Sequence, residues 1–281
     1  MASAINFAKA FGFDSVAAAA VFAVLYSLFA GYFVFKIIKD RGRVLISLTL
    51  FCLIRVAAFV MRAISAGNSG AGENESLFIA TEVLLSIGFF GLLYSAYSLV
   101  MDRCLHPNSQ LPIPILGQAL HLTRNRRLFR MTLLVPVALG IAGIDETSQD
   151  SSSTTGIALR KASVIIFLVL TILQVLHTLV LIKAEHEDPS QSLPSSSLSL
   201  RSTHTSLLFG LISLFLLIRE IFTVATISNL AKANNEHFWY PLVALPELLC
   251  VVLFVGIFLG SSGMQAQKGV EENDVENGIS M

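Results

Sequence analysis

The stretch "VLISLTLFCLIRVAAFVMRAI" (Val44–Ile64) decides the fold of this chain. It is almost wholly apolar and carries charge only at Arg55 and Arg62. About 20 consecutive, mainly apolar residues are enough for one helix to cross the hydrocarbon core of a bilayer. The stretch therefore predicts a transmembrane helix with an arginine near its middle.

The composition extends this prediction to the whole chain. Of 281 residues, 54% are hydrophobic and 14% are charged, and the mean hydropathy is +0.72. A soluble domain usually has about 25% charged residues. We expect an all-α, polytopic protein localised in a membrane, either the plasma membrane or an endomembrane. The formal net charge of zero gives no indication of a nucleic-acid partner.

Seven apolar stretches predict a seven-transmembrane-helix bundle within residues 16–260. The predicted spans are 16–35, 44–64, 77–100, 128–144, 162–182, 207–227 and 239–259. The fourth is the shortest and contains a proline and two glycines. Outside the bundle we expect a short N-terminal segment (1–15), a Ser/Pro-rich cytosolic linker (184–205) and a disordered acidic tail (261–281).

The distribution of basic residues predicts the orientation. Twelve Lys and Arg residues fall on one side of the predicted membrane, and four, Lys9, Arg160, Lys161 and Lys232, fall on the other. Cytosolic loops of membrane proteins carry the excess of Lys and Arg. We therefore expect the N-terminus outside and the C-terminus in the cytosol.

Two similar segments indicate an internal repeat. "LFCLIR" (Leu50–Arg55) and "LFLLIR" (Leu214–Arg219) agree at five of six positions, and a glutamate follows each, at Glu82 and Glu247. One interpretation is a 3+1+3 parallel repeat, in which the first three helices recur as the last three. The other is chance agreement in a chain dominated by a few apolar residue types.

The charged residues inside the spans form a candidate polar site. A lone charge at the bilayer centre costs about 2.5–3.5 kcal/mol on insertion scales, so we expect each to have a partner. We predict the pairs Arg55–Glu82 and Arg219–Glu247. Two neighbours are secondary members: Arg62, which competes for Glu82, and Glu220, which competes for Arg219. The pairs either line a cavity that binds a headgroup, amphiphile or ion, or only hold the helices together.

Three further features have two interpretations each. Gln174 and His177 share a face of the fifth span and either contact a ligand or, as we favour, pack against another helix. The basic loop 103–130 either attracts anionic lipids or only sets the topology. Cys104, next to the membrane, is a candidate palmitoylation site.

The sequence offers no sign of enzyme chemistry. We expect no catalytic residues, no metal site and no cofactor, because no motif for hydrolysis, phosphate binding or metal ligation stands out. "MDRC" (Met101–Cys104) is similar to the acid–arginine pair that ends the third helix of many G-protein-coupled receptors. We favour the other interpretation, an ordinary charge pair at a helix end.

Four further segments are informative: "FCLIRVAAFVMRAIS", "LFIATEVLLSIGFFGLLYSAYSLVMDR", "ALRKASVIIFLVLTILQ" and "LFLLIREIFTV". Together they resemble a fungal seven-transmembrane family known only as a domain of unknown function. This resemblance implies a seven-helix fold and a fungal origin, and it names no substrate. A looser likeness to fungal RTA-type lipid-translocating exporters implies lipid transport. The seventh helix of those exporters usually ends in His-Pro, whereas here it ends in "FLGSSG".

Two functions are consistent with these features. The first is a carrier or exporter of a lipid-like or small amphiphilic molecule that uses the paired charges. The second is a receptor-like or scaffolding protein that signals through its cytosolic loops. A cavity at mid-membrane between the two three-helix halves favours the first, and a tightly packed bundle open only to the outside favours the second.

Overall fold

A computed structural model of the chain describes residues 7–10, 12–40, 42–104, 126–149, 153–187 and 196–259. Within these ranges the protein is helical and contains no β-strand. In chain order the helices are α1 (Phe7–Ala10), α2 (Val16–Lys39), α3 (Arg43–Gly67), α4 (Ser69–Gly72), α5 (Glu75–Cys104), α7 (Arg126–Gln149), α8 (Thr154–Glu187), α9 (Ser196–Thr226), α10 (Leu230–Ala233), α11 (Glu236–Trp239), the π-helical turn η2 (Tyr240–Ala244) and the helix 245–259.

Seven stretches are long and apolar enough to cross a membrane, which confirms the seven-helix prediction. They are Val16–Lys39, Arg43–Gly67, Glu75–Asp102, Leu128–Thr147, Thr154–Lys183, Ser206–Thr226 and Glu236–Leu259. The fourth predicted span is part of α7, which continues past Pro136 as one helix of 24 residues. This is the architecture of a multi-pass membrane protein.

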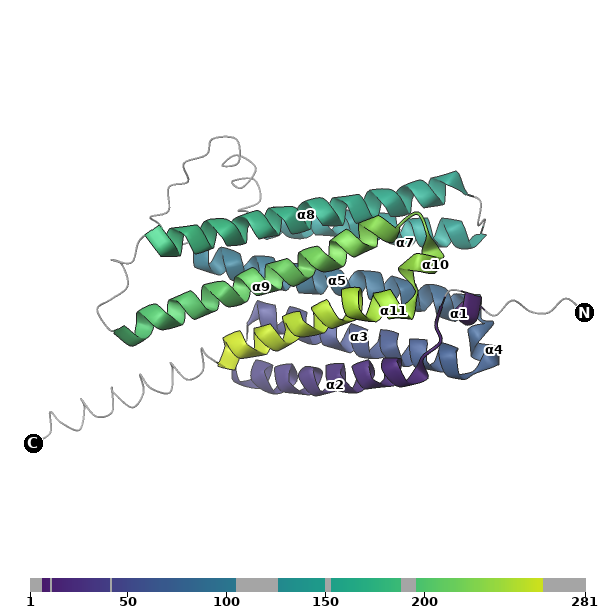
Figure 1. Cartoon of the computed structure of the whole chain (residues 1–281), viewed down its shortest axis with the longest axis horizontal. Coiled ribbons are helices and arrows are strands. Elements are labelled where there is room, and N and C mark those ends of the chain that lie inside the picture. The colour runs from purple at the N-terminus through teal and green to yellow at the C-terminus, as the bar shows by residue number, and fades with distance from the viewer. Residues whose placement is uncertain are drawn as a thin grey trace, which may run out of the picture.

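The long helices lie side by side along the long axis of the molecule (Figure 1). α3 packs against both α2 and α5, α7 joins α5 to α8, and α9 packs against α8 and the seventh span. This is the order of neighbours that a 3+1+3 repeat requires, and the repeat itself stays a prediction. The short helices α1, α4 and α10 gather at one end of the bundle, which we call the α1 end (Figure 1).

The helix 245–259 runs away from the α1 end to the opposite end of the bundle (Figure 1). The described N-terminal and C-terminal residues would therefore lie on opposite sides of a membrane. This agrees with an odd number of spans. Which side faces the cytosol stays a prediction from the basic residues.

The surface and core have the distribution expected of a protein in lipid. Large apolar side chains such as Val24, Leu28 and Ile38 on α2 are exposed, at 60%, 66% and 78%. The interior holds aromatic residues, including Tyr26, Phe51 and Phe89, together with an unusual number of charged side chains. In water such an apolar exterior would be unfavourable, and in a bilayer lipid tails cover it.

Glycines bring α7 and α8 into close contact. A Cβ atom on Gly143 would lie 2.8 Å from the backbone nitrogen of Arg160, and one on Gly156 would lie 3.0 Å from that of Thr147. Small residues at such positions let two helix backbones approach within a membrane. The side chain of Ser163 uses this proximity to donate to the carbonyl of Pro136 at 2.6 Å.

The helices extend further than the predicted spans. α8 ends at Glu187 and α9 begins at Ser196, so both take residues from the predicted linker 184–205. Hydropathy predicts only the apolar part of each helix, whereas the backbone hydrogen bonds of α8 and α9 continue into the polar sequence beside it. Residues 188–195, most of the basic loop 103–130 and the acidic tail 261–281 lie outside the described residues.

Candidate functional site

A cluster of four charged side chains lies inside the bundle. Oε1 of Glu247 accepts from Nη2 of Arg55 at 2.5 Å and from Nε of Arg219 at 3.2 Å. Nη1 of Arg219 also donates to Oε1 of Glu220. All four side chains are buried, and two cations balance two anions. The cluster is thus neutral as a whole, which is the condition under which buried charges are tolerated.

The predicted pair Arg219–Glu247 is confirmed, and the predicted pair Arg55–Glu82 is wrong. At a rise of about 1.5 Å per residue, Arg55 lies about 18 Å along α3 from its Gly67 end. Glu247 lies about 17 Å from the start of its span at Glu236, whereas Glu82 lies only about 10 Å into α5. Arg55 therefore meets the glutamate at its own depth, and that glutamate belongs to the other half of the chain.

Neighbouring residues shape the space around the two arginines. A Cβ atom on Gly88 would lie 3.3 Å from Cζ of Arg55, so the absence of a side chain there makes room for the guanidinium. The guanidinium of Arg219 lies 4.0 Å from the centre of the Phe89 ring, and that of Arg55 lies 5.3 Å from the ring of Phe51. Such contacts stabilise a desolvated guanidinium without adding a negative charge.

The seventh span departs from regular α-helical hydrogen bonding just before Glu247. Residues Tyr240–Ala244 form a π-helical turn, in which the amide of Leu245 donates to the carbonyl of Tyr240. Pro246 follows at once and has no amide hydrogen to donate. Isolated π-turns are frequent at functional sites because they change the direction in which the following side chains point.

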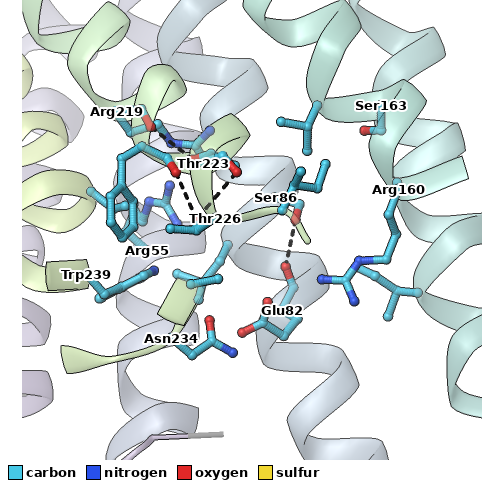
Figure 2. A pocket seen from close by; sticks show the side chains of 18 residues that line it. Arg55, Glu82, Ser86, Arg160, Ser163, Arg219, Thr223, Thr226, Asn234 and Trp239 are labelled. Atoms are coloured by element: carbon cyan, nitrogen blue, oxygen red, sulfur yellow. Dashed lines mark hydrogen bonds between the residues drawn. The ribbon is translucent and has the colours of Figure 1, made fainter. Parts of the chain in front are cut away.

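A cavity of about 140 Å³ lies between the two three-helix halves, beside the four charges (Figure 2). Liquid water occupies about 30 Å³ per molecule, so the space corresponds to roughly five waters. Its charged and polar lining residues are Arg55, Glu82, Ser86, Arg160, Ser163, Arg219, Thr223, Thr226 and Asn234. Every transmembrane helix except α2 contributes to the lining.

Two side chains of opposite charge, Glu82 and Arg160, face this cavity. Glu82 lines it from α5 and Arg160 from α8, and both side chains are partly exposed to it. Within the part of the chain that the structure describes, neither side chain forms a hydrogen bond or an ion pair within 4.0 Å. Asn234 lines the same space, is 6% exposed, and its carboxamide likewise has no partner among the described residues. Figure 2 shows these three side chains turned into the cavity.

Arg62, the predicted competitor for Glu82, lies elsewhere. Its Nη2 atom pairs with Glu236 of α11 at 3.4 Å. Its guanidinium lies 4.0 Å from the ring centre of Phe13 and 4.2 Å from that of Trp239. The prediction that Arg62 reaches Glu82 is therefore wrong, because aromatic rings surround Arg62 and a nearer carboxylate neutralises it.

Glu236 also fixes the N-terminal segment to the bundle. Its two carboxylate oxygens accept from the backbone nitrogens of Asp14 and Ser15, at 3.1 and 2.9 Å. Gly12 adopts a positive φ of 82° and packs against the carbonyl of Asn234, where a Cβ atom would come within 3.0 Å. Residues 12–15, which we call the N-terminal strap, thus lie against the segment that carries Asn234.

The polar residues of α8 form a second, separate cluster toward the opposite end of that helix. The hydroxyl of Thr178 shares a hydrogen bond of 2.8 Å with Ser213 of α9, and Nε2 of Gln174 reaches Thr178 at 3.4 Å. Nδ1 of His177 lies 2.8 Å from the carbonyl of Leu173, and its ring meets Tyr97 edge-on. These contacts link α8 to its neighbours, and none of the three α8 residues lines the cavity.

Two further predictions concern the side chain of Cys104 and the binding of metal ions. Cys104 is the last residue of α5, but its side chain is outside the described part of the structure. Among the described residues, no group of three or more His, Cys, Asp or Glu side chains could hold a metal ion.

Sequence reasoning missed Arg160, Asn234 and Glu236 as site residues. The hydropathy pattern assigns Arg160 to an outer loop, but α8 begins at Thr154 and carries it inside the span. The run of hydroxyl residues at 153–155 is a recognisable signal for an earlier helix start. Glu236 follows Asn235, whose side chain caps α11 by accepting from the amide of His237.

Comparison with known proteins gives a family but no relative of known function. No curated protein and no solved structure matches the chain. A family model described as "Domain of unknown function (DUF7702)" matches residues 13–257, from the N-terminal strap nearly to the end of the seventh span. The match thus includes the four-charge cluster and all the residues that line the cavity. The chain belongs to the DUF7702 family, a family of unknown function.

Proposed function

We propose that this protein is a carrier or exporter of lipid-like or small amphiphilic molecules, and that the polar part of the molecule binds in the charged cavity. One observation carries the proposal: a cavity between the two helix halves is lined by opposite charges that form no ion pair or hydrogen bond with any side chain among the described residues. Unpaired ionisable groups inside a membrane are costly and mark pathways for substrates or ions.

The position of the cavity between the two halves supports this function. Carriers built from repeated halves bind substrate where the halves meet, because movement of one half against the other then exposes the site to each side. Here the lining comes from α3 and α5 on one side and from α8, α9 and the seventh span on the other. The ion pair Arg55–Glu247 also joins the halves. Movement of one half against the other would therefore change the distance between these two side chains.

The looser likeness to fungal RTA-type exporters and the implied fungal origin belong to this proposal. They would make the substrate a membrane amphiphile. The exposed apolar surface gives a tail somewhere to lie while a headgroup occupies the cavity. Binding and movement of such a molecule need no catalytic group, which agrees with the expected absence of enzyme chemistry.

A second candidate, a receptor-like or scaffolding protein, is favoured by the packing of the other half of the bundle. The cavity lies toward the α1 end, whereas buried residues such as Tyr97, Phe129 and Leu133 fill the opposite part. The rings of Tyr97 and Phe129 stack with centres 3.6 Å apart. A bundle that opens at only one end can bind a ligand and respond to it without moving it.

Reconstitution into lipid vesicles tests the proposal. A lipid labelled on its acyl chain is placed in both leaflets, and a membrane-impermeant quencher reports movement between them. We expect movement with the wild-type protein and a large loss with Ser86→Phe, which places a ring in the cavity. Ile165→Phe on the exposed face of α8 is the matched control and should retain movement.

Comparison of the vesicle results with ligand binding separates the two candidates. No movement with any labelled amphiphile, from protein that still unfolds cooperatively at the normal temperature, would contradict the carrier. A ligand that binds in the cavity but never crosses the bilayer would favour the receptor.

A further inference from the structure

The two opposite charges in the cavity, Arg160 and Glu82, are close enough to interact electrostatically but do not form an ion pair. Arg160 is fixed on α8 by the close contact of its backbone with Gly143 of α7. Glu82 projects from α5, which contacts α7 and α8 across the cavity. No ion pair within 4.0 Å joins them, although both lie in the membrane-spanning part of their helices. A molecule that carries both charges would satisfy both residues at once.

We propose that the cavity binds a zwitterionic group in which a primary ammonium lies close to a phosphate or carboxylate. This inference rests on the proposed function and names its substrate class. The ammonium is bound by the carboxylate of Glu82 and the carboxamide oxygen of Asn234. The anionic group is bound by the guanidinium of Arg160, which offers a planar set of donors for two oxygens.

The neighbouring arginines do not make the cavity a simple anion site. Arg55 and Arg219 also line it, but Glu247 and Glu220 already neutralise them. Arg160 is then the one cation among the described lining residues without a bound carboxylate. A plain anion at Arg160 would lie near the charge of Glu82, whereas an attached ammonium turns that repulsion into attraction.

The lining also favours a primary over a quaternary ammonium. A primary ammonium has three N–H donors, which suit the acceptors of Glu82 and Asn234. Quaternary ammonium groups bind instead to open aromatic faces. Two aromatic residues, Phe222 and Trp239, line the cavity, and the guanidinium of Arg62 already covers the ring of Trp239 at 4.2 Å. The small volume fits a headgroup, so an attached tail must lie outside the cavity.

Binding to the purified full-length protein tests the ligand chemistry. The probes are O-phosphoethanolamine, phosphocholine, inorganic phosphate and ethanolamine, and titration calorimetry gives each affinity. One charge-assisted contact corresponds to a factor of about ten or more in affinity. We therefore expect phosphoethanolamine to bind at least about tenfold more tightly than each of the other three.

Variants assign each half of the probe to its residue. Glu82→Gln should remove the preference for phosphoethanolamine over inorganic phosphate, and Arg160→Gln should remove the preference for phosphoethanolamine over ethanolamine. Glu75→Gln and Lys161→Gln are the matched controls, because both side chains are exposed and close in sequence to the tested residues. Equal binding of phosphoethanolamine and phosphate by the wild type, or unchanged preferences in both variants, would overturn the assignment.

A second measurement distinguishes a lipid from a free molecule as the source of this chemistry. Competition of phosphoethanolamine with nanodiscs that contain phosphatidylethanolamine, but not with discs of phosphatidylglycerol, would identify a lipid headgroup. Binding that no lipid competes with would identify a soluble zwitterion. Both results support the zwitterionic site, and competition by phosphatidylglycerol alone would overturn it.

This inference and the proposed function can fail separately. Movement of labelled lipids in vesicles that is equally fast for every headgroup would contradict the zwitterionic site and keep the carrier. Selective binding of phosphoethanolamine by a protein that moves no amphiphile would contradict the carrier and keep the site.

Discussion

Arg55 and Glu247 lie 192 residues apart in the sequence, and their side chains meet inside the bundle at 2.5 Å. The contact ties α3 of the first half to the seventh span of the second. Arg219 contacts the same carboxylate oxygen of Glu247 from α9. A single glutamate thus holds three helices, and it does so next to the cavity that lies between the halves.

The four buried charges should behave as two removable pairs. Glu247→Leu leaves Arg55 without a partner, and stranding a buried charge costs about 3–5 kcal/mol. Adding Arg55→Leu removes the stranded charge and leaves Arg219 with Glu220, so thermal unfolding in detergent should return close to the wild-type temperature. The control double variant, Glu247→Leu with Arg219→Leu, leaves Arg55 and Glu220 unpaired and should not recover. Equal recovery in both double variants would contradict this pairing.

The contact between α7 and α8 should not tolerate a methyl group at Gly143. An added Cβ would meet backbone atoms of α8, which cannot turn aside as a side chain can. Overpacking of this kind costs about 1–3 kcal/mol, so Gly143→Ala should unfold at a lower temperature. Gly256→Ala is the matched control, because nothing lies within 4 Å of its added Cβ. An equal effect at both positions would show that α7 and α8 do not approach as closely as described.

The N-terminal strap should loosen when Glu236 loses its charge. Glu236→Gln removes one of the two carboxylate acceptors that hold the amides of Asp14 and Ser15, together with the partner of Arg62. We expect hydrogen exchange of at least one of these two amides to rise at least about tenfold, because a hydrogen bond to a charged group contributes about 1.5–3 kcal/mol. Glu73→Gln, at an exposed position of the same end, should leave exchange unchanged. Unchanged exchange in Glu236→Gln would mean that other contacts hold the strap.

Epitope tags at the two ends should be found on opposite sides of the membrane. Seven spans require this, and the basic residues predict the N-terminal tag outside and the C-terminal tag in the cytosol. Protease protection in sealed vesicles of known orientation measures it. Both tags on the same side would mean that α7 does not cross.

The sequence predicted the helices well because hydropathy and length determine whether a stretch can span a bilayer. It predicted α7 despite Pro136, since the positions of basic residues required a span there. It could also pair Arg219 with Glu247, which lie on consecutive helices at compatible depths. These predictions depend on local composition and on position along one helix, which are properties that a single sequence contains.

The partner of Arg55 could not be predicted in the same way. Choosing Glu247 over Glu82 requires knowing that the seventh span packs beside α3, and this depends on tertiary structure. The available clue was the depth of each residue along its helix, because the depth of Arg55 is closer to that of Glu247 than to that of Glu82. Arg160 escapes prediction for a local reason: the apolar run begins at about residue 162, whereas the helix itself begins at Thr154, so the hydropathy pattern assigns Arg160 to a loop.

The π-helical turn at Tyr240–Ala244 makes the length of this segment critical. A π-turn holds one residue more than an α-helical turn would, and each residue of an α-helix rotates the next side chain by about 100°. Deleting one residue from this turn would restore a regular helix and rotate Glu247 by about that angle relative to Trp239. The carboxylate that joins the halves and the indole that packs on Arg62 could then no longer both face the interior. This segment can therefore accept substitutions much more readily than a change in its number of residues.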